Sequence, residues 1–71
     1  MASARPVVVY PPDEDGGRRV RMDSEIAGRA YNLPDVVEFL RRAGVEEVNE
    51  VWVRRSSLIE WRGGGPDVWE H

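Results

Sequence analysis

The sequence predicts a small α+β domain in which an antiparallel sheet packs on one amphipathic helix. Three observations support this prediction. Short runs of β-forming residues separated by turn residues fill the first part of the chain, one helical pattern with signals at both ends follows, and further short apolar runs come after it. We expect a three-stranded meander, then the helix, then one or two C-terminal strands.

The length of the chain, 71 residues, is enough for one domain with a marginal core. The sequence has no cysteine, so disulfides cannot stabilise the fold and thiolates cannot bind zinc. Good packing or association with another chain must then provide the stability. We expect one domain over residues 1–62 and a glycine-rich tail over residues 63–71.

The expected strands of the meander cover residues 5–12, 18–22 and 25–31. The prolines around the valines of the first run favour an edge strand, because proline cannot donate to a central ladder. The second run places Val20 and Met22 on one face and Arg19 and Arg21 on the other. Gly28 in the third run indicates a bulge or a close approach of the helix.

Residues 32–44 carry the clearest helical pattern. Asn32 suits the N-cap, Asp35 lies near the positive end of the helix dipole, and Gly44 fits the left-handed position after the last turn. One apolar stripe at helical spacing contains Leu33, Val36, Val37, Leu40 and Ala43. Phe39 flanks this stripe, where it either covers the edge of the core or anchors another protein.

The C-terminal third is less regular. The alternation of Val51 and Val53 with other side chains predicts a strand, and SLIEW is a candidate for another. The glycines of the final RGGGPDVWEH segment permit two arrangements. Either the backbone reverses so that Trp69 packs on the core as a latch, or the tail is an arm that a partner orders.

The residues offer little for catalysis or metal binding. His71, the single histidine, ends the chain beside Glu70, and these two residues are either native or the remains of a tag. The serines lie in no nucleophile motif, and the paired carboxylates are typical of solvated loops. The glycines at 63–65 lack the lysine and the following helix of a phosphate loop. We therefore expect no enzyme, no catalytic residue, no metal and no cofactor.

The net charge of −3 comes from ten arginines, no lysine and thirteen carboxylates. The use of arginine without lysine is typical of GC-rich bacterial genomes. The planar guanidinium of arginine also suits phosphate, carboxylate and aromatic partners. The sequence has no run of 18 apolar residues, and the N-terminal apolar run is too short for a signal peptide. We expect a cytoplasmic protein without a membrane partner.

Association with another protein or with itself is the function that the sequence favours. Three tryptophans lie in the last twenty residues, and exposed aromatic side chains beside arginines are typical of interface hot spots. Trp61 is expected to close the core. The expected partner contacts are Trp52, Arg54, Trp69 and Phe39.

The alternative function is binding of single-stranded nucleic acid on the open face of the sheet, where arginines neutralise phosphate and aromatic rings stack on bases. The expected residues of this face are Arg19, Arg21, Arg29 and Tyr31, with Arg18 and Tyr10 as further members. The negative net charge and the absence of a known stacking motif make this alternative the less favoured one.

Overall fold

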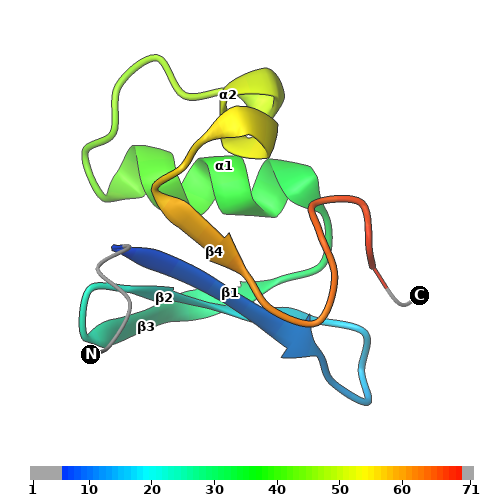
Figure 1. Ribbon diagram of the computed structural model, residues 1–71. Coiled ribbons are helices and arrows are strands. Elements are labelled where there is room, and N and C mark those ends of the chain that lie inside the picture. Colours follow the sequence, from blue (N-terminus) through cyan, green and yellow to red (C-terminus); the bar gives the residue numbers. More distant parts are fainter. Residues whose placement is uncertain (1–5, 70–71) are drawn as a thin grey trace.

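The computed structural model describes residues 6–69, so Arg5, Glu70 and His71 lie outside the described residues. The elements are β1 (Val7–Pro12), β2 (Arg18–Met22), β3 (Glu25–Ala30), α1 (Leu33–Arg42), α2 (Glu50–Arg55) and β4 (Ile59–Trp61). The strands form one mixed sheet in the order β3-β2-β1-β4, and both helices lie on the same side of it (Figure 1). The predicted α+β class and the antiparallel meander of β1, β2 and β3 are confirmed.

Strand β1 is central in the sheet, so the prediction of an edge strand was wrong. It pairs antiparallel with β2 and parallel with β4. The pairing with β4 covers only Val7–Val9, and the register with β2 shifts between Val9 and Pro12. The prolines at the end of β1 thus lie where the ladder is irregular and β4 no longer pairs, and their missing N–H groups cost the sheet little.

Helix α1 has the predicted start and end. The side chain of Asn32 accepts a hydrogen bond of 3.0 Å from the backbone N–H of Asp35, and Gly44 has a φ of 98°. The buried side chains of the helix are Leu33, Val36, Val37 and Leu40. Ala43, predicted to continue this stripe, is exposed because the helix ends before it can turn back to the sheet.

The segment Glu50–Arg55 is the short helix α2, not the strand that its alternating valines predicted. Asn49 provides the N-cap, since its side chain accepts a hydrogen bond of 2.9 Å from the N–H of Trp52. In a strand Val51 and Val53 would share one face. The helix instead buries Val53 completely and leaves Val51 61% exposed. The SLIEW candidate is confirmed as β4.

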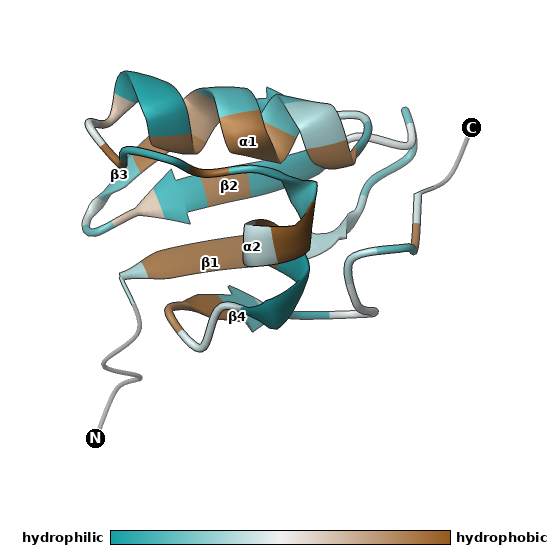
Figure 2. Cartoon of the chain, turned by 90° about the horizontal axis from the view of Figure 1, so that it is seen from above, coloured by the Kyte–Doolittle hydropathy of each residue, from teal (hydrophilic) through white to brown (hydrophobic). Residues whose placement is uncertain are grey.

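The core lies between the sheet and the two helices. Its buried members are Val7, Val9, Val20, Ala30, Leu33, Val36, Val37, Leu40, Val48, Val53 and Ile59. Figure 2 shows apolar residues along β1 and in patches on α1. Gly28 permits the close approach predicted for it, because a Cβ there would lie 2.8 Å from Cζ of Phe39. Neither helix of residues 6–69 has the length and apolar character needed to cross a bilayer.

Candidate functional site

Arg18 is fully buried on the helix side of the sheet, which corrects its predicted place on the open face. Residues of one strand alternate between faces, so Arg18 lies on the same side as Val20, whose side chain is in the core. Burial lowers the pKa of the guanidinium, yet an arginine stays protonated at neutral pH. The chain therefore places a charged group where its donors need partners.

Each of the three guanidinium nitrogens of Arg18 donates to main-chain carbonyl oxygens, with bond lengths from 2.7 to 3.0 Å. The acceptors belong to Tyr10, Arg62, Gly64, Gly65 and Val68. The guanidinium also lies over the rings of Trp61 and Trp69, and each ring centroid is 5.3 Å from Cζ of Arg18. Carbonyl oxygens and aromatic rings thus compensate the buried charge.

The C-terminal segment folds back around this arginine. Gly63 and Gly64 have φ values of 77° and 129°, which glycine adopts without strain. The indole N–H of Trp69 donates a 2.7 Å hydrogen bond to the carbonyl of Pro66. This packing corresponds to the latch arrangement, whereas the domain boundary at residue 63 stays a prediction.

Arg54, a predicted partner contact, is engaged within the chain. Its guanidinium lies 2.6 Å from a carboxylate oxygen of Asp67, so it joins α2 to the C-terminal segment. The hydrogen bond from Arg54 lowers the pKa of Asp67 and raises that of Arg54. Both side chains reach solvent, which limits the energy of such a pair.

Phe39 and Trp52, two further predicted contacts, are partly buried and pack against the core from different helices. Phe39 covers Gly28 of β3. Trp52 lines an apolar groove of about 170 Å³. The groove also contains Pro6, Val7, Met22, Asp23, Leu40, Ala43, Val45 and Leu58. Of the four predicted contacts, Trp52 alone lines this groove, and Leu58 is a groove residue that was not predicted from the sequence.

The open face of the sheet carries the basic residues of the alternative function. Arg19 and Arg21 have their guanidinium carbons 5.9 and 5.8 Å from the ring centroid of Tyr10, and Arg62 has its own at 5.3 Å. Arg62 was not predicted to belong to this face. The feature that could have indicated this is the position of Arg62 directly after β4, which pairs with β1, the strand of Tyr10.

Arg29 and Tyr31, also predicted for the open face, lie at the end of β3 near the β1–β2 turn. Nε of Arg29 is 3.1 Å from a carboxylate oxygen of Asp13, and Nη1 is 3.0 Å from one of Asp15. A hydrogen bond with Tyr31, and then the charge of Asp13, raise the pKa of Arg29. Arg29 therefore forms ion pairs within the chain, with Asp13 and Asp15.

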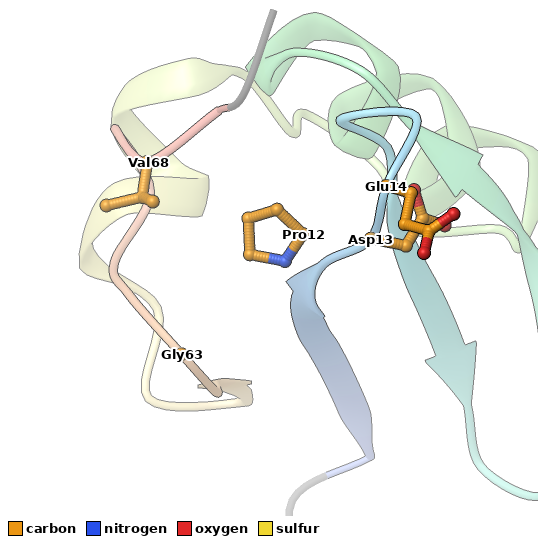
Figure 3. Close-up of a pocket in the computed structure, with 5 residues that line it drawn as sticks. All are labelled: Pro12, Asp13, Glu14, Gly63 and Val68. Atoms are coloured by element: carbon orange, nitrogen blue, oxygen red, sulfur yellow. The ribbon is translucent and has the colours of Figure 1, made fainter.

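A shallow hollow separates this turn from the C-terminal segment. Figure 3 shows Pro12 between the turn residues Asp13 and Glu14 on one side and Gly63 and Val68 on the other. The carboxylate of Asp13 is bound to Arg29 and accepts a hydrogen bond from a backbone N–H, so the hollow offers no buried acid for proton transfer. Over residues 6–69, His, Cys, Asp and Glu side chains form no group of three that could hold a metal ion.

Comparisons with known proteins give no match. Neither a family model, nor a curated protein, nor a solved structure resembles this chain. The groove beside Trp52 and the basic open face are thus the two surfaces from which its function is inferred.

Proposed function

We propose that this chain is a non-enzymatic binding module that associates with another protein through the apolar groove beside Trp52. The observation that carries the proposal is the groove itself, which opens where α1, α2 and the start of β1 meet. Its volume is about 170 Å³. An apolar cavity of about 150 Å³ can hold benzene, so the groove suits one large apolar side chain of a partner.

Two side chains of the groove support this proposal. Leu58 is 49% exposed, although its neighbour Ile59 is buried in the core. Trp52 is partly buried against the core and also lines the groove. A tryptophan in a pocket beside exposed apolar surface is typical of interface hot spots, because its large ring excludes water from the contact.

The groove continues into an acidic hollow. The two share Met22, Asp23 and Ala43, and the hollow adds Glu25 and Ile26. Asp23 and Glu25 are exposed carboxylates, and Ile26 is 52% exposed. This combination favours a partner segment in which lysine or arginine flanks an apolar side chain, because opposite charges at the rim guide and orient binding.

Among the contacts expected from the sequence, Trp52 is the residue on which the proposal depends. Arg54 is paired with Asp67, and Trp69 is stacked on Arg18. Phe39 is packed over Gly28. These internal contacts make the three side chains contributors to the fold, and a partner would have to compete for them.

Selection of displayed random short peptides against the full chain tests the proposal. We expect enriched peptides to share an apolar residue next to lysine or arginine, and to bind Leu58→Asp at least tenfold more weakly, since a carboxylate would enter the groove. Val51→Asp is the matched control. Val51 is 61% exposed and does not line the groove, so this variant should bind as the wild type does.

Enriched peptides that bind both variants equally would overturn the proposal, as would a selection without enrichment. Light scattering over a range of concentrations identifies self-association. A dimer that Leu58→Asp dissociates and Val51→Asp leaves intact would show that the occupant is a second copy of this chain, and would replace the partner protein in the proposal.

A further inference from the structure

The open face of the sheet has a cluster of one tyrosine and three arginines, which we call the Tyr10 cluster. Its members are Tyr10, Arg19, Arg21 and Arg62. Tyr10 comes from β1, Arg19 and Arg21 come from β2, and Arg62 follows β4. The guanidinium carbons lie between 5.3 and 5.9 Å from the ring centroid, so the four side chains form one continuous surface.

The floor of the cluster is apolar and covered. Val8 faces this side, because it stands across from Arg21 and Glu60 in the register, and it is only 1% exposed. The alkyl stems of long side chains can cover such a residue while their charged ends stay near water. The arginines of the cluster are thus held over the strands by packing.

The cluster concentrates positive charge on a chain whose net charge is −3. Of its three guanidinium groups, that of Arg62 pairs with a carboxylate, since its Nε lies 2.6 Å from Oε2 of Glu60. The carboxylates of Asp13 and Asp15, at the end of the face, are paired with Arg29. The field over Tyr10 is therefore positive, whereas the hollow beside the Trp52 groove is acidic.

Arg21 has an unmet hydrogen-bonding capacity. Its Nε is buried, and no acceptor bonds to it among the described residues. A buried donor without a partner costs free energy, and native chains retain few of them. A bound oxyanion that reorients this guanidinium would relieve the cost.

We propose that the Tyr10 cluster is a second binding site, which takes single-stranded nucleic acid. Guanidinium forks bind phosphate oxygens, and both guanidinium planes and tyrosine rings offer flat surfaces on which bases stack. An acidic protein segment would use the charges alone. A base and its phosphate would use the charges and the planar surfaces together, and this match favours nucleic acid as the ligand.

Fluorescence anisotropy with labelled oligothymidylate and the full chain tests this site. With three arginines engaged, the logarithm of the binding constant should fall with the logarithm of salt concentration with a slope of about −2, and Arg19→Gln should reduce that slope by about 0.7. Arg19 is exposed, so the substitution should not disturb the fold. Tyr10→Leu should weaken binding by about fivefold or more, because one stacking surface is lost.

Arg55→Gln is the matched control, since it removes one exposed arginine from α2, on the helix side of the sheet. It should leave the affinity within about twofold. Circular dichroism checks the fold of each variant. If Arg19→Gln or Tyr10→Leu does not fold, Arg62→Gln takes its place as the cluster variant.

Three results would overturn the proposal. The first is no binding of oligothymidylate by the wild type at about 20 mM salt, where such contacts are strongest. The second is an equal loss for Arg55→Gln and Arg19→Gln, which would indicate unspecific attraction. The third is displacement of the oligonucleotide by polyglutamate as readily as by unlabelled oligothymidylate, which would identify the ligand of this face as an acidic protein segment.

Discussion

Nη2 of Arg18 donates a hydrogen bond of 2.7 Å to the carbonyl oxygen of Gly64, 46 residues further along the chain. This bond joins the second strand to the glycine turn that follows β4. The other bonds of the guanidinium end on carbonyls of the same turn and on Tyr10. One buried side chain thus binds the C-terminal segment at four of its carbonyl oxygens.

Arg18→Lys should destabilise the fold by about 2–4 kcal/mol. The ammonium of lysine has three donors on one atom, so it cannot reach the carbonyls that the planar guanidinium serves, and several acceptors would stay unpaired. Urea unfolding measures the loss. Arg19→Lys, an exposed neighbour on the same strand, should change the stability by less than about 0.5 kcal/mol. Equal stability of the two variants would contradict this account of Arg18.

Gly63→Ala should destabilise the turn, and Gly65→Ala should not. A Cβ at Gly63 would lie 2.6 Å from Cβ of Pro11, and its φ of 77° alone costs about 1–2 kcal/mol for a residue with a side chain. A Cβ at Gly65 would meet nothing within 4 Å. Thermal unfolding of the two variants gives the comparison. A loss of stability for Gly65→Ala as large as that for Gly63→Ala would contradict the close contact at Gly63 and the open space at Gly65.

The meander and α1 could be predicted because local signals and tertiary packing agree there, although β1 is a central strand and not the expected edge strand. Asn32 caps α1, Gly44 follows its last turn, and the expected apolar stripe is buried except for Ala43. At α2 the local signals conflict with one another, because valines favour a strand whereas Asn49 is a good N-cap. Packing favours the helix, which buries Val53 and leaves Val51 exposed.

The role of Arg18 could be read only in part from the sequence. Its alternation with Val20 and Met22 places it on the core side, which is a signal available without a structure. What could not be read is the compensation of its charge. The acceptors lie on backbone groups of a distant segment, and backbone carbonyls carry no sequence signature.

The Arg54–Asp67 pair should make a contribution to stability that depends on pH. The pKa of Asp67 is lowered from its ordinary value of 3.8 in the folded chain, so the unfolded chain binds the proton more readily. The contribution is therefore present above about pH 4 and disappears as the pH falls through the lowered pKa. Urea midpoints of wild type and Asp67→Asn should differ at pH 7 and converge at low pH. Glu14→Gln, which removes an exposed carboxylate of the β1–β2 turn, is the control.

Trp69→Ala should cost about 2 kcal/mol, because it removes a ring that covers Arg18 and packs against the core. Trp69→Phe should cost about half as much, since the ring stays over the guanidinium while the indole hydrogen bond to Pro66 is lost. Urea unfolding measures both variants. If the ring acts through Arg18, the double variant with Arg18→Lys should be more stable than the sum of the single losses predicts, by at least about 0.5 kcal/mol. Strictly additive losses would mean that Trp69 and Arg18 stabilise the chain independently, and the C-terminal segment would then be held by its core contacts alone.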